Sequence, residues 1–335
     1  MVRLKLGMAT VMVLLVAAAG TGSWWASELD PGEGTPSSDR RDPGAVASAG
    51  AVRPVALSAA PARPRPKALP RVARFAVASF NLLGSSHTEP GGHHAHLASG
   101  PERLPGAMAI LAGHDVSVAG FQEFQPDQRA AFERDVKGWA MFPGLAMKGR
   151  GGENSVAWRT STWDLVESDT VPIPYFNGRI REMPFVLLRH RATGLPAYFS
   201  TFHNPADTRA FPNQQRFRNE ATDRQVALFK KLEATGIPQF VTGDMNERDE
   251  YFCRVTGATG LVAAAGGGNN GRCAPPKRAP IDWIFGSGQA QFTDYTVDRS
   301  PLARRTTDHP VSIASVAVDA QRFARASRAR VSAAR

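Results

Sequence analysis

Asp244 and Asn246 follow a short apolar run, PQFVTG, and are separated from each other by a single residue. Side chains two positions apart in an extended segment point to the same side of the chain. A carboxylate and a carboxamide arranged in this way can hold one small charged group between them.

Other apolar runs also carry chemically useful side chains at their ends. ARFAVASFN ends at Asn81, DVSVAGFQE at Glu123, and AYFSTFHN at His203 and Asn204, whereas Asp282 lies near the start of IDWIFGSG, and Asp308 and His309 come just before VSIASVAV. Near-continuous apolar runs of this length are typical of strands that are buried on both faces of a sheet. We therefore expect these polar side chains to converge at one edge.

These residue types suit the hydrolysis of a phosphodiester. Because the substrate is already anionic, attack by water requires a cation on the phosphoryl oxygens, an activated nucleophile and protonation of the leaving oxygen. Carboxylate and amide oxygens hold Mg²⁺ through part of its coordination shell and leave positions for water and substrate. We predict Glu123 as the principal metal ligand, with Asn81 and Asp308 beside it.

The two histidines are predicted to act on the phosphate itself. His203 and His309 would serve as general acid or base and as electrostatic stabilisers, with one ring nitrogen fixed by a carboxylate. Asp244 and Asn246 would hold the attacking water, a phosphoryl oxygen or a second metal ion.

Helices are expected between the apolar runs, at residues 101–113, 126–137 and 213–236. In the last of these, Phe217, Ala221, Val226, Phe229 and Leu232 form an approximate helical stripe. Strands and helices alternate early and strands dominate late, which favours sheets packed together with helices outside. Trp158 and Trp163 are expected in the core, within a hairpin.

Six of these motifs, SFN, GFQE, STFHN, GDMN, IDWIF and TDHP in this order, resemble the endonuclease/exonuclease/phosphatase superfamily of metal-dependent phosphodiesterases. The resemblance covers nearly all of residues 71–318. It implies an α/β four-layer sandwich, with two central mixed β-sheets flanked by helices. It also implies a site that uses Mg²⁺, often aided by Ca²⁺ or Mn²⁺, in which Asp282 orients His309.

Within that superfamily the sequence looks most like secreted deoxyribonucleases. REMPFVLL supplies Arg181, whose planar fork of donors would grip a phosphate oxygen. The position of Cys253 and Cys273 matches that of a disulfide in those enzymes. In an exported protein a sole pair of cysteines is expected to form a disulfide, and two free buried thiols are the alternative.

The ends of the chain differ from its middle. Residues 1–27 carry basic residues before an apolar run, which predicts an export signal, either cleaved or kept as a membrane anchor. Residues 28–71 are expected to be a disordered linker, 72–318 the catalytic domain, and 319–335 a basic tail. Most of the net charge of +10 lies in these ends, which suits an anionic envelope surface as well as nucleic acid. The protein is expected outside the cytoplasm, as a monomer.

Several alternatives stay open at this point. The substrate could be DNA, RNA, a phospholipid or an inositol phosphate, or the fold could be a non-catalytic envelope binding module. No aromatic cluster that would enter a membrane is evident outside the export segment. The histidine-rich stretch 87–96 is either a transition-metal site or a mobile loop beside the active site.

Individual site residues also have purely structural explanations. Turn and capping preferences could account for Asn81, Glu123, His203, Asp244, Asn246 and Asp308. Arg181 could form an ordinary surface ion pair.

Overall fold

The computed structural model describes residues 70–323. The predicted export segment, nearly all of the predicted linker and most of the predicted basic tail lie outside these residues. Within residues 70–323, no helix is long and apolar enough to cross a membrane.

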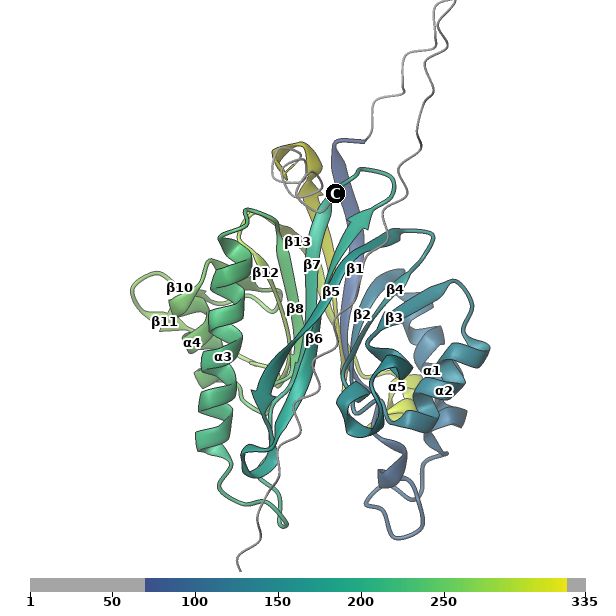
Figure 1. The fold of residues 1–335 in the computed structure, drawn as a ribbon. Helices are drawn as coiled ribbons and strands as arrows, with labels where there is room; N and C mark the ends of the chain where they lie inside the picture. Colours follow the sequence, from purple (N-terminus) through teal and green to yellow (C-terminus); the bar gives the residue numbers. More distant parts are fainter. Residues whose placement is uncertain (1–69, 324–335) are drawn as a thin grey trace, which may run out of the picture. The chain divides into compact units, whose positions relative to one another are not determined.

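Two six-stranded sheets form the centre of the domain (Figure 1). The first sheet has the order β13-β14-β1-β2-β4-β3, and the second has the order β5-β6-β7-β8-β12-β9. The strands of the first sheet are β1 (Val72–Asn81), β2 (Val116–Gln122), β3 (Trp139–Phe142), β4 (Ser155–Arg159), β13 (Gln291–Asp298) and β14 (Val311–Asp319). Those of the second sheet are β5 (Trp163–Pro174), β6 (Ile180–His190), β7 (Pro196–His203), β8 (Gln239–Asp244), β9 (Leu261–Ala263) and β12 (Asp282–Ser287).

Both sheets are mixed. β1 pairs in parallel with β2, and β7 pairs in parallel with β8, while the other neighbours are antiparallel. Parallel neighbours need a crossover connection, which in both cases contains a helix. These helices are α1 (Gly100–Gly113) and α3 (Gln215–Glu233).

Helices cover the outer face of each sheet, so the four-layer prediction is confirmed (Figure 1). α1, α2 (Pro126–Asp135) and α5 (Pro301–Thr306) pack on the first sheet, and α3 and α4 (Asp249–Ala258) pack on the second. Single 3-10 turns are η1 (Ser85–His87), η2 (Gly144–Ala146), η3 (Gly149–Gly152) and η4 (Phe176–Gly178). The three predicted helices correspond to α1, α2 and α3, and most of their ends lie within about two residues of the predicted ones. α4 and α5 were not predicted.

Three apolar clusters lie between the four layers. One fills the space between the sheets, and the other two lie under the outer helices. Alternate residues of β1 serve different clusters, because successive side chains of a strand point to opposite faces. Phe75 and Val77 face the second sheet, whereas Ala78 and Phe80 face the helices. This double burial explains why the strands appear in the sequence as near-continuous apolar runs.

The two sheets lie close together where β2 carries Gly120. A Cβ atom at this position would lie only 1.9 Å from the Thr242 hydroxyl oxygen and 2.7 Å from that of Thr201. Both threonines belong to the second sheet. Glycine is therefore required here by the close approach of the backbone, and the contact fixes the separation of the sheets beside the polar strand ends.

The predicted hairpin around Trp158 and Trp163 is wrong, although both side chains are buried as expected. Trp158 lies in β4 of the first sheet and Trp163 in β5 of the second, so the short turn between them carries the chain across the core. Both indole rings pack in the cluster between the sheets.

The buried face of α3 is more polar than the predicted stripe. Arg218 and Gln225 are buried on it, while Phe217 and Val226 are only partly buried. Arg218 bonds to Asp207, and the Gln225 amide donates to Asn204 directly after β7. These polar contacts connect the helix to the strand end that carries His203.

The chain remains packed slightly beyond the predicted domain end. β14 runs to Asp319, which accepts two hydrogen bonds from the Arg71 guanidinium. Ala320 and Phe323 are buried in the cluster between the sheets.

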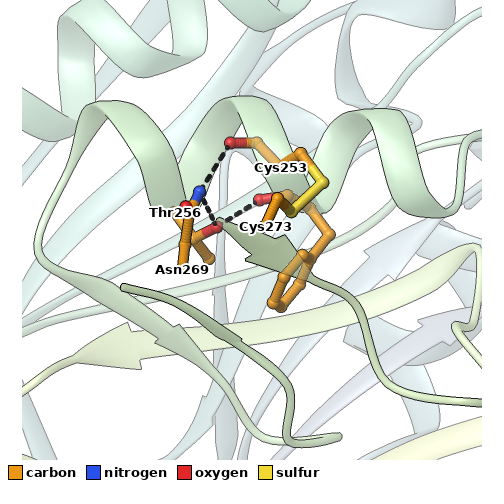
Figure 2. Close-up of a disulfide and its surroundings, with 5 residues drawn as sticks. Cys253, Thr256, Asn269 and Cys273 are labelled. Carbon is orange, nitrogen blue, oxygen red and sulfur yellow. Dashed lines mark hydrogen bonds between the residues drawn. A yellow bond between two sulfur atoms is a disulfide. The ribbon is translucent and has the colours of Figure 1, made fainter. Parts of the chain in front are cut away.

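Cys253 and Cys273 form a disulfide, as predicted (Figure 2). Cys253 lies on α4, and Cys273 lies in β11 (Cys273–Ala274), which pairs with β10 (Gly268–Asn269). The Asn269 amide donates to the Cys253 carbonyl and to the Thr256 hydroxyl (Figure 2). The small hairpin is therefore fastened to α4 by a covalent bond and two hydrogen bonds.

Replacing both cysteines by serine is expected to lower the free energy of unfolding by about 3 kcal/mol, because the bond closes a loop of 20 residues in the unfolded chain. Denaturant unfolding of the double variant and of the reduced wild type should give the same loss. A loss under about 1 kcal/mol would show that the bond restrains the unfolded chain little.

Candidate active site

The polar strand ends meet at one edge of the two sheets, and the strand directions explain why. β1 and β2 are parallel, as are β7 and β8, so the carboxyl ends of each pair lie at the same edge. β12 runs antiparallel to β8, which places its first residue, Asp282, opposite Asp244. His203 is also in register with Asp244. His309 lies at this edge because β14, which follows it, runs antiparallel to β1.

A cavity of about 790 Å³ opens at this edge. Six of the nine predicted site residues line it: Glu123, Arg181, His203, Asp244, Asn246 and His309. The other three contact this set or lie next to it in the chain. Asn81 and Asp282 are buried beneath the cavity, and Asp308 precedes His309.

Asp244 is at the centre of the arrangement. Its Oδ2 atom accepts a hydrogen bond from the Asn81 amide at 3.1 Å, and it lies 3.5 Å from His203 Nε2 and 3.7 Å from His309 Nε2. Burial and the neighbouring charge of Asp282 raise the pKa of Asp244. The same carboxylate thus contacts both histidines, and its raised pKa makes it more basic than an ordinary aspartate.

Asp282 holds His309 in position. Both carboxylate oxygens lie close to His309 Nδ1, at 3.0 and 3.1 Å. Burial of His309 disfavours its charge, but the hydrogen bond and charge of Asp282, together with Asp244 and Asp308, outweigh burial and raise its pKa to about 10. His309 is therefore an imidazolium at neutral pH, with Nε2 directed toward Asp244.

His203 has the opposite protonation preference. It is buried, and burial lowers its pKa despite the nearby charges of Asp244 and Glu123. The Tyr175 hydroxyl lies 3.4 Å from its ring nitrogens. At neutral pH the site thus pairs one charged and one neutral imidazole across Asp244, an arrangement suited to proton transfer.

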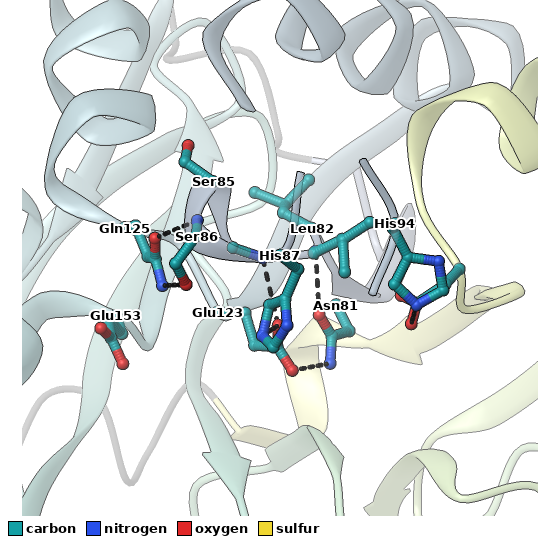
Figure 3. Close-up of polar contacts among 12 residues, drawn as sticks. Asn81, Leu82, Ser85, Ser86, His87, His94, Glu123, Gln125 and Glu153 are labelled. Carbon is teal, nitrogen blue, oxygen red and sulfur yellow. Dashed lines mark hydrogen bonds and ion pairs between the residues drawn. The ribbon is translucent and has the colours of Figure 1, made fainter. Parts of the chain in front are cut away.

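Glu123 presents a carboxylate to the cavity from just beyond β2 (Figure 3). Its backbone adopts a φ of +55°, a conformation that is uncommon for a residue with a side chain and that recurs at functional sites. Burial would raise its pKa, but hydrogen bonds from His87, Asn81 and the Gly84 amide hold that pKa well below the usual range. Glu123 is therefore ionised.

Asn81 connects Glu123 to Asp244. Its amide nitrogen donates to both carboxylates at 3.1 Å, and its amide oxygen accepts the Leu83 backbone N–H. In this arrangement Asn81 orients the two acids, which adds a positioning role to the predicted ligand role.

Asn246 is both a turn residue and a residue of the cavity, the two roles considered for it from the sequence. Its backbone N–H donates to Asp244 Oδ1, which makes the tight Asx-type turn, and its φ is +51°. The residue also lines the cavity, so the turn is the means by which the side chain reaches the site. Its amide donates to the Asn204 carbonyl.

Arg181 reaches the cavity with its charge partly compensated. Its guanidinium donates to Glu153 at 2.8 Å and stacks over the Tyr175 ring at 3.9 Å. Arg181 and Glu153 form an ion pair, which was the alternative to phosphate binding considered from the sequence. This pair is mostly buried, unlike an ordinary surface ion pair, and both residues line the cavity. The planar fork retains donors beyond the Glu153 bond.

The donor set suits a divalent cation. Among residues 70–323, three ligand atoms from Asp244, Asp282 and His309 lie within 4.8 Å of one another. Within this group, His309 Nδ1 and Asp282 already form a hydrogen bond with each other. Glu123 is an ionised carboxylate that faces the cavity, which is the ligand type that Mg²⁺ and Mn²⁺ favour.

An aromatic pair in the cavity was missed by the sequence analysis. Phe176 and Phe211 stack at 4.6 Å with an interplanar angle of 17°, and both line the cavity while staying partly exposed. Arg150 and Arg209 line it as well. Phe176, Phe211 and Arg209 belong to two turn-rich segments, PYFNGR and DTRAFPN, and Arg150 belongs to η3. The only signal of these segments was the occurrence of aromatic and basic residues in loops.

Comparison with known families agrees with this geometry. The model of the Endonuclease/Exonuclease/phosphatase family matches residues 78–309, and the chain belongs to this family. Membership of this family supports phosphoester hydrolysis as the general function. No curated protein sequence matches the chain significantly.

Solved structures share the fold at low sequence identity. A family protein from Bacteroides thetaiotaomicron has a TM-score of 0.58 and 19% identity, over 74% of this chain and 99% of that chain. The mannosyl-6-phosphatase Bt3783 of the same organism has a TM-score of 0.55 and 17% identity, over 72% of this chain and 99% of that chain. D. rerio TDP2, complexed with a single-strand DNA product, has a TM-score of 0.54 and 18% identity, over 73% of this chain and 99% of that chain.

Proposed function

We propose that the protein is an exported, divalent-metal-dependent phosphodiesterase that cleaves DNA or RNA by in-line attack of an activated water. The observation that carries the proposal is the convergence of Glu123, Asp244, His203 and His309 on one cavity. Each of these residues arrives from a different strand end, and no structural requirement of the sheets alone calls for two acids and two histidines there.

Proton transfer is assigned to the residues around Asp244. Asp244, with its raised pKa, accepts a proton from the attacking water, which Asn246 helps to orient. His309, charged at neutral pH and held by Asp282, stabilises the phosphoryl oxygens and protonates the leaving oxygen. His203 donates a hydrogen bond to the phosphate from its neutral ring, and Arg181 neutralises a further oxygen.

A metal ion fits beside this proton-transfer set. Glu123 would hold Mg²⁺, or Mn²⁺ or Ca²⁺ in its place, with Asp308 and Asn81 contributing. The ion would supply positive charge to the phosphoryl oxygens.

The rim of the cavity favours nucleic acid as the substrate. The stacked pair Phe176 and Phe211 offers an apolar face on which a base can stack, and three arginines, Arg150, Arg181 and Arg209, offer positive charge to a polyanionic backbone. The complex of D. rerio TDP2 with a DNA product agrees with this substrate class.

Export and monomeric assembly complete the proposal. The basic, then apolar, start of the sequence and the disulfide both suit a location outside the cytoplasm, free or anchored through the N-terminal segment. The basic ends would hold the protein at an anionic envelope surface.

The substrate class is tested by a panel of plasmid DNA, single-stranded DNA, RNA, sphingomyelin and inositol phosphates. We expect cleavage of nucleic acid that EDTA abolishes and Mg²⁺ or Mn²⁺ restores. Turnover of sphingomyelin or an inositol phosphate without nucleic-acid cleavage would reject the nuclease assignment. Binding of nucleic acid without turnover of any substrate would indicate a non-catalytic binding module.

A further inference from the structure

Three aromatic rings lead from the residues assigned to the phosphate out to the rim of the cavity. The Tyr175 ring lies 5.3 Å from the His203 ring and 3.9 Å from the Arg181 guanidinium. Phe176 contacts Tyr175 at 4.5 Å and stacks on Phe211 at 4.6 Å. Tyr175 is buried, whereas Phe176 and Phe211 are partly exposed, and all three rings line the cavity. The series therefore begins beside the phosphate-binding groups and ends in accessible rings.

Phe211 is the outer ring of this series. The two phenylalanine rings are nearly parallel, with an interplanar angle of 17°, so Phe176 supports one face of Phe211. Among residues 70–323, Phe211 has no second aromatic partner. Aromatic rings attract one another in offset stacks with centroids about 4.5–7 Å apart. A planar group that enters the cavity can therefore extend the stack by one ring.

The two loops that carry the phenylalanines are joined by one buried glutamine. Gln214 accepts the Asn177 backbone N–H at 2.9 Å, and its amide donates to the Asn177 side chain at 3.2 Å and to the Pro212 carbonyl at 2.9 Å. Thr208 and Phe211 also exchange two backbone hydrogen bonds across their turn. The stack is thus held in place before any substrate arrives, which lowers the entropy cost of binding to it.

Positive charge lies beside the stack. Arg209 belongs to the turn that carries Phe211, is exposed, and lines the cavity. Within the described part of the chain it forms no ion pair, so its charge is available to a ligand. Proteins that bind single-stranded nucleic acid combine a basic groove for the backbone with aromatic side chains on which bases stack. Both components are present on this side of the cavity.

The stack discriminates between paired and unpaired bases. In a duplex each base is covered on both faces by its neighbours, so extruding one onto a protein ring costs free energy. A single strand can present its bases without that cost, because they are readily splayed apart. A fixed aromatic face beside the phosphate-binding groups therefore favours a strand whose bases are unpaired.

We propose that Phe211, supported by Phe176, is a stacking subsite for an unpaired base next to the scissile phosphate, and that it makes the enzyme select single-stranded nucleic acid over duplex. The inference rests on the nuclease activity in the proposed function and specifies the strandedness of the substrate. Arg209 holds the backbone beside the stacked base.

The test compares one oligonucleotide of defined sequence as a single strand and as a duplex, with full-length protein in Mg²⁺ or Mn²⁺. We expect kcat/KM to be at least about 10-fold higher for the single strand. Phe176→Leu/Phe211→Leu keeps the apolar character but removes the aromatic faces. In this variant kcat/KM for the single strand should fall about 10- to 100-fold, with little change for the duplex. Phe211→Tyr, which retains a ring, should behave as wild type.

Phe292→Leu is the matched control. Phe292 is a partly buried phenylalanine on β13 that does not line the cavity. Its substitution should leave the preference for single strands unchanged. Thermal unfolding shows whether each variant is folded.

A second measurement does not depend on turnover. Fluorescence anisotropy of a labelled single strand in EDTA should show that the Kd rises about 10-fold or more in Phe176→Leu/Phe211→Leu. Equal cleavage of single strand and duplex, with the Kd unaltered in this variant, would keep the nuclease and overturn the subsite. Single-strand binding that depends on the two rings, without cleavage of any nucleic acid, would reject the nuclease and keep the subsite. Neither binding nor cleavage of nucleic acid would overturn both.

Discussion

Replacing His309 by alanine is expected to lower kcat for phosphodiester cleavage by about 10³- to 10⁴-fold, the upper part of the range for a lost general acid. The reason is that Asp282 and Asp244 keep this imidazole charged, with a pKa of about 10, at the point where the phosphate would develop negative charge. Steady-state cleavage of a defined oligonucleotide at saturating metal measures the loss.

Asp282→Asn tests whether His309 acts as a held imidazolium. Because Asp282 acts through His309, the double variant Asp282→Asn/His309→Ala should lose about as much activity as His309→Ala alone. His114→Ala is a matched control, since His114 also pairs with an aspartate, Asp298 at 3.3 Å, but does not line the cavity. Additive losses from Asp282→Asn and His309→Ala would show that the two residues act separately.

Asp244→Asn is expected to lower kcat by about 10³-fold, since the substitution keeps the shape but removes the base and the charge between the two histidines. Asp244 Oδ2 is the atom that Asn81, His203 and His309 all approach.

The stability of Asp244→Asn should move in the opposite direction. The pKa of Asp244 is raised in the folded state, so its ionisation costs folding free energy once the pH exceeds the unfolded value, and removing the charge relieves that cost. In metal-free protein we expect an equal or higher Tm than wild type at pH 7 to 8, with the gain shrinking as the pH falls. A Tm that falls along with activity would attribute the lost turnover to damaged folding. Asp223→Asn, an exposed aspartate on α3, is the control.

The fold was largely predictable because its strands are buried on both faces. Such strands appear as near-continuous apolar runs, and the first polar side chain after each run marks its exit at the sheet edge. Asn81, Glu123, His203 and Asp244 were found in this way. The short turn between Trp158 and Trp163 was wrongly predicted to form a hairpin. The local sequence of a turn does not determine whether the next strand joins the same sheet or the other sheet.

The rim of the cavity could not be predicted for a related reason. Phe176 and Phe211 are 35 positions apart in irregular segments, so neither periodicity nor a motif connects them. The contacts of His87 with Glu123 and of His94 with Asp308 also join residues that are distant in the chain. These contacts depend on how loops fold back over the sheet edge.

By itself the sequence determined the layered α/β architecture, the cysteine pair and the residue types gathered at one edge, because burial patterns and strand ends are properties of short segments. Only the tertiary structure decided which groups carry protons. His203 and His309 look alike in the sequence, yet burial lowers the pKa of one, while Asp282, 27 residues away, raises that of the other. A proton's free energy depends on the charges and solvent within a few ångströms, and these neighbours are assembled only when the two sheets pack.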